Sequence, residues 1–452
     1  MELINRKILV VGFGKSGLST ARCLTGRGAE VTIGDIKPES VLDKEILKEV
    51  RKSGIKLETG EHRIETFLSS DMIIVSPGVP LDIKPLVAAR NAGINIFGEL
   101  EIASRFLENP ILAVTGTNGK TTTVTIVEAI IKRSGRSLFA GGNIGTPLMD
   151  YVSGDMKADY VLVEVSSFQL DTAEKFRPAV SLILNITPDH LDRYEDFNAY
   201  ARSKYSITRN QGEGQYAVLN DDDPLLHSFE PESSVKVLRY GIEKAKGRNA
   251  YIDRGRLVVC IPGKPELVFS LDGFRLPGSH NIGNLMGAVL LSLCAGIEEN
   301  YIREVILDFK GLPHRVEHIA NIAGIDFYDD SKATNVDAAV KSLEVFERPV
   351  ILIAGGIHKG GDYDPLVKAS ISRVKKGIFI GEARFMLGDA FNTLIPYEFA
   401  EDMEGAVKKA FSIAVKDDVI LLAPACSSFD MFTDYGHRGR VFREKVEGLI
   451  DG

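Results

Sequence analysis

Two glycines, a lysine and a threonine stand in residues 116–121, GTNGKT, at a spacing suited to phosphate chemistry. Glycines let backbone N–H groups approach phosphate oxygens, Lys120 can pair with the β- and γ-phosphates, and the Thr121 hydroxyl can ligate Mg²⁺. The first glycine of the usual G-x-x-x-x-G-K-[ST] pattern falls on Val114, so the loop is a shortened variant. On this string alone, a glycine turn with a surface lysine remains the alternative.

The flanking residues predict the elements that position this loop. Residues 111–114 are apolar and favour a buried strand, and residues 124–131 place apolar side chains on one helical face. Gly135 is a suitable helix stop. The order strand, loop, helix puts the glycines at a helix N-terminus, whose partial positive charge attracts phosphate.

A second glycine loop lies near the N-terminus. Residues 12–17 read G-x-G-x-x-G after a predicted strand at 7–11, and Asp35 follows at the end of a second predicted strand. This spacing is typical of a Rossmann dinucleotide site. The same residues would serve another diphosphate, with the acid holding a sugar hydroxyl or a base, and the spacing does not separate the two alternatives.

Two further residues could hold a metal ion with Thr121. Glu164 ends the apolar run 159–165, where a carboxylate is costly unless it is paired or metal-bound. His190 follows the apolar run 180–185, on the side of the sheet where ligands bind, although a lone histidine is more often structural. Lys204 lies in a predicted helix with nothing to distinguish it, so its position alone predicts a surface lysine.

Three other parts of the chain contain residues that could face a ligand. The glycine-rich run 138–145 contains Asn143 and could approach a ligand, although an ordinary glycine turn is an equal alternative on local grounds. Asn281 and Asn284 stand three residues apart, where both can face one ligand. Residues 241–274 predict short antiparallel strands. Loops at 354–362 and 424–430 follow apolar strands and predict a second ligand surface.

These alternating patterns predict an α/β protein of three domains. Residues 1–98 would form a Rossmann-like domain, and residues 99–310 a central P-loop domain with an antiparallel addition. Residues 311–452 would form a C-terminal Rossmann-like domain. A chain of 452 residues has room for roughly three domains.

Composition excludes several classes of function. The net charge of −8 argues against a nucleic-acid binder, because no basic excess exists to displace counterions. No apolar run approaches about 18 residues, so no membrane span is expected. The four cysteines lack C-x-x-C spacing, which argues against a zinc site or a disulfide framework. With no signal-peptide pattern, a reducing, cytoplasmic location is expected.

Six motifs together resemble a known family over most of the chain. GTNGKTTT, NITPDHLDRY, HNIGN and GLPHRVE resemble the Mur ligases, and folylpolyglutamate synthases share them in part. DDSKATN and LLAPACSSFDMF resemble the branch that adds D-glutamate. The resemblance implies an ATP-dependent amide ligase of bacterial cell-wall synthesis that acts through an acyl phosphate. Its substrates would be UDP-N-acetylmuramoyl-L-alanine and D-glutamate, its cofactors ATP and two Mg²⁺ ions without NAD, and a monomer is expected.

The resemblance also implies a role for individual residues. The catalytic residues would be Lys120, His190, Lys204, Arg315 and Lys332. ATP would bind Gly116, Thr117, Asn118, Gly119, Lys120, Thr121, Thr122, Asn284, Arg315 and Asp330. The uridine substrate would bind Gly14, Lys15, Ser16, Gly17, Asp35, Ile36, Lys37, Gly78, Asn143 and His190. D-glutamate would bind Lys332, Thr334, Lys359, Ser428 and Tyr435. The metal ligands would be Thr121, Glu164, His190 and Lys204 as a carbamate.

Three other classes fit the sequence less well. A nicotinamide-dependent dehydrogenase would leave the loop at 116–121 without a role. A GTPase would need an N-K-x-D motif, and the chain contains no Asn-Lys dipeptide. A folylpolyglutamate synthase gives no reason for a complete N-terminal uridine-diphosphate domain, and another amino-acid-adding Mur ligase is the remaining alternative. Residues 311–452 are expected to close over the nucleotide by rigid rotation.

Overall fold

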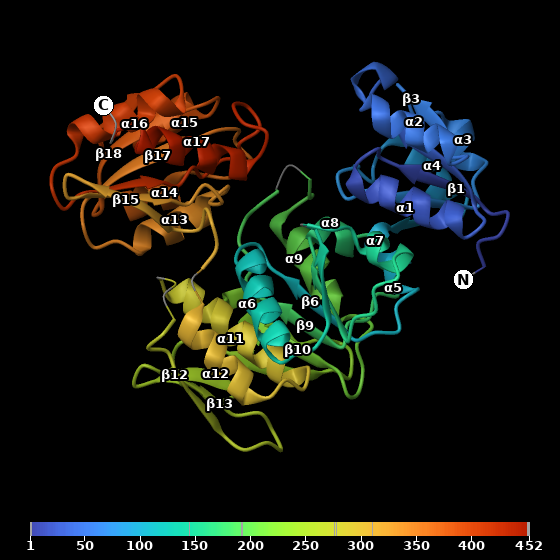
Figure 1. Ribbon diagram of the computed structural model, residues 1–452, viewed down its shortest axis with the longest axis horizontal. Helices are drawn as coiled ribbons and strands as arrows, with labels where there is room; N and C mark the ends of the chain where they lie inside the picture. The colour runs from blue at the N-terminus through green and yellow to red at the C-terminus, as the bar shows by residue number, and fades with distance from the viewer. Residues whose placement is uncertain are drawn as a thin grey trace.

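Three parallel-rich sheets, each flanked by helices, follow one another along the chain (Figure 1). The structure is a computed structural model that describes residues 2–143, 145–190, 193–274, 276, 278–309 and 311–449. Leu191 and Asp192 of the NITPDHLDRY motif, and residues 310 and 450–452 of the expected domain ranges, lie outside the described residues. The α/β class predicted from the alternating pattern is confirmed.

The N-terminal sheet has the strand order β3-β2-β1-β4-β5, and all of its pairs are parallel. Strand order reverses at β1, so residues 12–17 leave the sheet at the switch point where ligands bind in doubly wound folds. The elements are β1 (Lys7–Val11), α1 (Lys15–Gly26), β2 (Glu30–Asp35), α2 (Lys44–Lys52), β3 (Lys56–Thr59), α3 (Ile64–Leu68), β4 (Met72–Val75), α4 (Lys84–Asn91) and β5 (Asn95–Gly98), with a 3-10 turn at Glu39–Val41.

The central sheet has the order β14-β13-β12-β11-β10-β9-β6-β8-β7, with β6 between two parallel neighbours. Strands β12 to β14 pair antiparallel, as the short strands predicted for residues 241–274 require. The first elements are α5 (Glu99–Ser104), β6 (Ile111–Thr115), α6 (Lys120–Arg133), β7 (Leu138–Gly142), α7 (Leu148–Ser153), β8 (Tyr160–Glu164), α8 (Ser167–Leu170), β9 (Val180–Ile183) and α9 (Phe197–Tyr205), with a 3-10 turn at Ser206–Thr208. The others are β10 (Tyr216–Asn220), α10 (Pro224–His227), β11 (Lys236–Tyr240), β12 (Ala250–Asp253), β13 (Arg256–Val259), β14 (Leu267–Ser270), α11 (Ser279–Cys294) and α12 (Glu299–Asp308).

The C-terminal sheet has the order β15-β16-β20-β17-β18-β19. Its first strand pairs antiparallel with β16, an edge hairpin that the sequence pattern did not predict. Strands β17 and β20 are parallel neighbours, so the loops that follow them meet at one sheet edge. The elements are β15 (Glu317–Ile322), β16 (Ile325–Asp329), α13 (Val336–Glu344), β17 (Val350–Gly355), α14 (Asp364–Ser370), β18 (Val374–Ile380), α15 (Arg384–Phe391), β19 (Tyr397–Phe399), α16 (Met403–Ile413), β20 (Val419–Leu422) and α17 (Tyr435–Glu447).

The first two sheets share an apolar cluster, whereas the third sheet has apolar clusters of its own. One apolar cluster runs from the N-terminal sheet, including Val10 and Leu24, into one face of the central sheet, including Ala113 and Ile183. Helices α1 and α7 pack together at this junction. The C-terminal sheet has apolar clusters of its own on both faces. Its contacts with the central domain that frame the site are polar.

Two expectations from composition can be compared with the structure. The four cysteines all lie in the described part of the chain and are free, as their spacing predicted. Over the described ranges, no helix combines the length and the apolar content needed to cross a membrane. The domain limits near residues 98 and 310 stay predictions.

Candidate active site

The phosphate loop connects β6 to α6 with a backbone that requires glycine at two positions. Gly116 and Gly119 have φ values of 151° and 83°, in the region that other residues rarely adopt. A Cβ at Gly119 would also collide with the Asn284 amide, which approaches from α11. The loop therefore lies against Asn284 at the start of α6. This contact brings together two motifs that are 165 residues apart in the sequence.

Lys120 lies across the loop that precedes it. Its Nζ donates hydrogen bonds to the Gly116 and Thr117 carbonyl oxygens, both at 2.9 Å. Burial lowers the pKa of the Lys120 ammonium, and the carboxylates of Glu164 and Asp189 partly oppose that shift. A cation held in this way is placed to neutralise phosphate oxygens at the same loop.

Glu164 ends β8, the strand next to β6, and its side chain is buried at 3% exposure. Its carboxylate accepts hydrogen bonds from the Thr121 hydroxyl at 2.9 Å and the Asn143 amide at 3.4 Å. The structure therefore brings together the threonine, the acid and the asparagine that the sequence singled out. An oxygen-rich group of this kind suits Mg²⁺.

Lys204 is buried at 2% exposure, so the surface position expected from its helix is wrong. Its Nζ donates to the Gly116 carbonyl at 2.9 Å and lies 4.6 Å from the centre of the Tyr200 ring. Burial, followed by the nearby Lys120 ammonium, holds the pKa of Lys204 well below its ordinary value. This shift favours the neutral amine more than in an exposed lysine, and the neutral amine is the form that reacts with carbon dioxide.

His190 lies in the long connection after β9 with a left-handed backbone, at φ 54°. Its ring packs edge-on against Phe168 at 4.9 Å, and its Nε2 is 3.7 Å from an Asp189 carboxylate oxygen. Burial tends to raise the pKa of Asp189, but Lys359 and His190 outweigh it and the net shift is downward. The neighbouring Asp189 carboxylate also interacts with Lys120, and it therefore connects His190 to the phosphate loop.

The C-terminal domain supplies cations to the same region. Burial lowers the pKa of the Arg315 guanidinium, with Asp330 opposing the shift. Burial and Arg315 lower the pKa of Lys332 to about 7, and its Nζ lies 3.8 Å from the centre of the Tyr435 ring. Burial raises the pKa of Asp330 to about 7, and that carboxyl accepts a short hydrogen bond from Ser342.

A cavity of about 620 Å³ collects these residues between the central and C-terminal domains. Most of the predicted ATP and D-glutamate residues line it, whereas Gly116, Tyr435 and Ser428, which is buried at 2% exposure, are not among the described residues that line it. Of the predicted residues, the wall contains Thr117, Asn118, Gly119, Lys120, Thr121, Thr122, Asn143, Glu164, His190, Asn284, Arg315, Asp330, Lys332, Thr334 and Lys359.

A polar bridge between the two domains crosses this cavity and was not anticipated from the sequence. The Asn118 amide donates to Asp337 at 2.6 Å, and the Thr187 hydroxyl donates to the same oxygen at 3.3 Å. The Asn335 amide donates to Asn118 at 3.3 Å and to Asp189 at 3.2 Å. The N-terminus of α13 thereby contacts the phosphate loop directly.

His314 was also missed as a candidate, although it precedes Arg315 in the GLPHRVE motif. Its Nδ1 lies 2.6 Å from the Asp329 carboxylate, and its backbone N–H donates to Glu317 at 2.9 Å. Asp329 is fully buried and also accepts from the Ser331 N–H at 2.8 Å. These bonds hold the backbone beside Arg315. The sequence could have indicated this role, because His314 directly precedes an arginine that was predicted to be functional.

The residues predicted for the uridine substrate lie mostly in the N-terminal domain. Asp35 accepts hydrogen bonds from the Phe13 N–H at 2.6 Å and the Lys37 N–H at 2.8 Å, so it holds the glycine loop itself. Gly78 accepts from Arg193 at 3.3 Å beside a cavity of about 420 Å³ between the N-terminal and central domains. The other predicted residues of this group in the N-terminal domain are Gly14, Lys15, Ser16, Gly17 and Ile36.

Comparison with known families gives one consistent result along the chain. Residues 6–98 match the description "Mur ligase MurD-like, N-terminal domain". Residues 114–292 match "Mur ligase middle domain", and residues 314–426 match "Mur ligase, glutamate ligase domain". The chain belongs to the Mur ligase family, which confirms the resemblance seen in the motifs.

Curated relatives extend over the full length. The chain is 42% identical over 452 residues to the UDP-N-acetylmuramoylalanine–D-glutamate ligase of Geotalea uraniireducens, covering 100% of this chain and 99% of the relative. It is 39% identical over 456 residues to the protein of that name from Thermoanaerobacter sp. strain X514, covering 99% and 100%. These relatives are named for the reaction that DDSKATN and LLAPACSSFDMF predict.

Solved structures share the fold. A pseudomurein peptide ligase type C from Methanothermus fervidus superposes with a TM-score of 0.61 at 23% identity, covering 98% of this chain and 100% of that one. UDP-N-acetylmuramate-alanine ligase from Thermotoga maritima gives 0.58 at 21% identity with the same coverage. A FolC structure from E. coli gives 0.58 at 16% identity but covers 78% of this chain and 94% of its own.

Proposed function

We propose that this protein joins D-glutamate to UDP-N-acetylmuramoyl-L-alanine at the expense of ATP, as a monomer in the cytoplasm. The observation that carries the proposal is the shared cavity, in which Lys120 of the phosphate loop and Lys332 and Lys359 of the C-terminal domain line one space. A phosphate site and a set of cations for a dicarboxylate must lie this close if one carboxyl group is first phosphorylated and then attacked.

The first chemical step follows from the unreactivity of carboxylates toward amines in water. The L-alanyl carboxylate attacks the γ-phosphate of ATP, the bond from that phosphorus to the β-bridging oxygen breaks, and an acyl phosphate and ADP form. Lys120 and Arg315 reduce the repulsion between the anions that approach each other. Both cations line the cavity, and both are buried, where a charge acts more strongly than in water.

The second step needs a neutral amine and a well-held amino acid. The nitrogen of D-glutamate attacks the acyl carbon, and inorganic phosphate leaves the tetrahedral adduct. Lys332, Lys359 and the Thr334 hydroxyl line the cavity and can bind the two carboxylates of D-glutamate. The lowered pKa of Lys332, about 7, reflects burial among cations, so an incoming dicarboxylate would be bound strongly at this position.

The residues near the phosphate loop fit magnesium. Thr121 and Glu164 offer a hydroxyl and a carboxylate within 2.9 Å of each other, and His190 with a carbamylated Lys204 would hold a second ion. The lowered pKa of Lys204 fits the carbamate, because an ammonium could not react with carbon dioxide. Bound Mg²⁺ supplies positive charge to phosphate oxygens as charge moves during transfer.

Water must be kept from the acyl phosphate, and the polar joint between the central and C-terminal domains supports closure as the means. Asn118 and Asp337 already bridge that joint at 2.6 Å. Rotation of residues 311–452 about it would bring Arg315 and Lys332 toward the phosphate loop or away from it.

The experiment that tests the function is phosphate release from ATP with Mg²⁺, UDP-N-acetylmuramoyl-L-alanine and a panel of D- and L-amino acids. The expected result is that D-glutamate is the one amino acid of the panel that supports phosphate release, with one new amide formed per ADP. Release with an L-amino acid instead would identify another amino-acid-adding Mur ligase, and release with a folate substrate a folylpolyglutamate synthase. No release with any pair would refute the proposal.

A further inference from the structure

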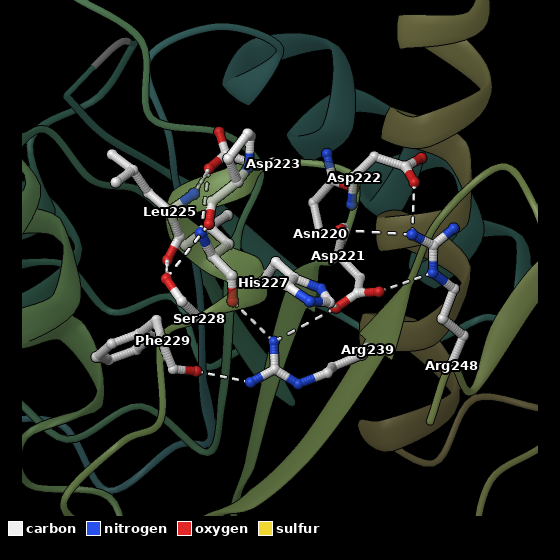
Figure 2. A network of polar contacts seen from close by, with 12 residues as sticks. Asn220, Asp221, Asp222, Asp223, Leu225, His227, Ser228, Phe229, Arg239 and Arg248 are labelled. Atoms are coloured by element: carbon white, nitrogen blue, oxygen red, sulfur yellow. Dashed lines mark hydrogen bonds and ion pairs between the residues drawn. The ribbon is translucent and has the colours of Figure 1, made fainter. Parts of the chain in front are cut away.

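The turn after β10 carries three consecutive aspartates, residues 221–223, which we call the acidic turn. Asp221 and Asp223 are buried, at 8% and 7% exposure. Figure 2 shows Asp221 between Arg239 and Arg248, with Asp223 on the far side of the turn beside Leu225. The three carboxylates therefore do different things, although they are adjacent in sequence.

Asp223 contacts backbone N–H groups on two different segments. One oxygen accepts from the Leu225 and Leu226 N–H groups at 2.9 and 3.1 Å, which caps the short helix α10. The other oxygen accepts from the Ile186 N–H at 2.7 Å, across 37 residues of sequence. The cap alone would need only a serine or an asparagine at this position. The bond to Ile186 is an additional contact that needs the second carboxylate oxygen.

Ile186 lies between the two residues that hold the phosphate loop from the side. The Asn185 side chain accepts from the Asn118 N–H at 2.8 Å and donates to the Asn118 carbonyl at 3.1 Å. The Thr187 N–H donates to the Thr117 hydroxyl at 3.0 Å. A bond that fixes the Ile186 N–H therefore fixes the segment against which Thr117 and Asn118 rest.

The other aspartates join the acidic turn to a second wall of the same cavity. The Asp221 N–H donates to the Tyr240 carbonyl at 2.6 Å, and Asp222 accepts from the Ile242 N–H at 2.7 Å. Arg248 bridges Asp221 and Asp222, at 2.8 Å to each. Tyr240 and Ile242 line the 620 Å³ cavity together with the phosphate loop, and Asp222 and Asp223 of the acidic turn line it as well. The turn is thus a short polar connection between two walls of the nucleotide cavity.

We propose that Asp223 is a positioning residue for phosphoryl transfer. It holds residues 185–187 at a fixed place relative to the wall at residues 240–242, so that Thr117 and Asn118 present the phosphate loop in one geometry. Asp223 lines the cavity, but both of its carboxylate oxygens accept hydrogen bonds from backbone N–H groups, so it acts through Ile186 and not on the reacting atoms. The inference rests on the proposed function, because phosphoryl transfer is the step that the loop geometry would serve.

The variant Asp223→Ser separates the two contacts. Serine is a good helix N-cap, so α10 keeps its cap, but the side chain is too short to reach Ile186 as well. With ATP, UDP-N-acetylmuramoyl-L-alanine and D-glutamate, kcat is expected to fall about tenfold to hundredfold, because the phosphate loop is no longer held in one geometry; this range corresponds to the loss of one charge-assisted hydrogen bond. The KM values for the uridine substrate and for D-glutamate are expected to stay within about twofold, because the hydrogen bonds of Asp223 go to Ile186, Leu225 and Leu226, none of which is assigned to these substrates.

Asp221→Asn is the matched control. It weakens the contacts to Arg239 and Arg248 on the same turn but leaves the bond between Asp223 and Ile186 intact, so kcat is expected to stay near the wild-type value while the melting temperature falls. If Asp223→Ser does not fold, Asp223→Asn replaces it, since asparagine also caps helices and turns its NH₂ group toward the Ile186 N–H.

The outcomes are distinct. A kcat loss confined to the Asp223 variants supports the inference. An unchanged kcat in the folded Asp223 variant, or an equal loss in Asp221→Asn, overturns it while the proposed function stands. A wild-type protein that releases no phosphate overturns the proposed function itself.

Discussion

The contact between Asn118 and Asp337 gives the sharpest test of how the two domains cooperate. The hydrogen bond is 2.6 Å long, its acceptor is a half-buried carboxylate, and it joins the phosphate loop to the first turn of α13. A hydrogen bond to a charged group contributes about 1.5–3 kcal/mol, which corresponds to roughly tenfold to hundredfold in a rate or binding constant. If the bridge aligns the C-terminal cations with ATP, that energy should appear in kcat/KM for ATP.

A double-mutant cycle measures this energy. The four proteins are the wild type, Asn118→Ala, Asp337→Ala and the double variant, assayed by phosphate release at varied ATP. We expect each single variant to lose about tenfold or more, and the double variant to lose little beyond the worse single one, with a coupling energy of about 1.5–3 kcal/mol. Glu344→Ala is the control, because Glu344 ends the same helix and pairs with Lys341 at 2.9 Å, whereas no hydrogen bond joins it to the phosphate loop among the described residues. Additive losses in the double variant would refute the bridge.

Three other predictions concern charged residues. Lys204→Ala should abolish most activity, and short-chain carboxylates should restore part of it if a carbamate is the functional form; full activity in the variant would refute that role. Asp35→Ala should raise KM for the uridine substrate more than KM for ATP, because Asp35 holds the N-terminal glycine loop, and equal effects would remove it from that role. Lys332→Met should eliminate D-glutamate use and yet stabilise the fold. The pKa of Lys332 falls from 10.5 to about 7 on folding, so the unfolded chain binds more protons between these values and stability contributed by this group rises with pH. In chemical denaturation the gain from Lys332→Met should therefore grow as pH falls from 10.5 to 7 and level off below; a pH-independent gain would contradict the shift.

Much of the site could be predicted from short stretches of sequence, because the residue types that bind phosphate lie next to one another in the chain. The phosphate loop needs glycine at residues 116 and 119 for its backbone, and the strand and helix around it follow from apolar periodicity. Glu164 could be singled out because a carboxylate in an apolar strand is costly without a partner, and the structure gives it Thr121 at 2.9 Å. The three-domain α/β class followed from the same alternation of strands and helices and is confirmed.

Contacts between distant segments could not be read in this way. The bond from Asn118 to Asp337 spans 219 residues, and no periodicity encodes it. Lys204 lies on a helix whose pattern gives no sign that its amine is buried under the phosphate loop. The edge strand β15 was missed because its burial is only partial, so its residues carry a weak apolar signal. Tertiary packing decided each of these positions.

The central and N-terminal domains share one continuous apolar core, whereas the C-terminal domain has cores of its own. The domain with the phosphate loop is therefore joined to the N-terminal domain by apolar packing, whereas the domain with the cations proposed for D-glutamate is packed separately. A chain ending before residue 311 would keep the glycine loop at 116–119 but lose Arg315, Lys332 and Lys359 together. Such a fragment would keep the phosphate loop but lose part of the wall assigned to ATP and the cations assigned to D-glutamate, so we expect amide formation to require the last third of the chain to be docked.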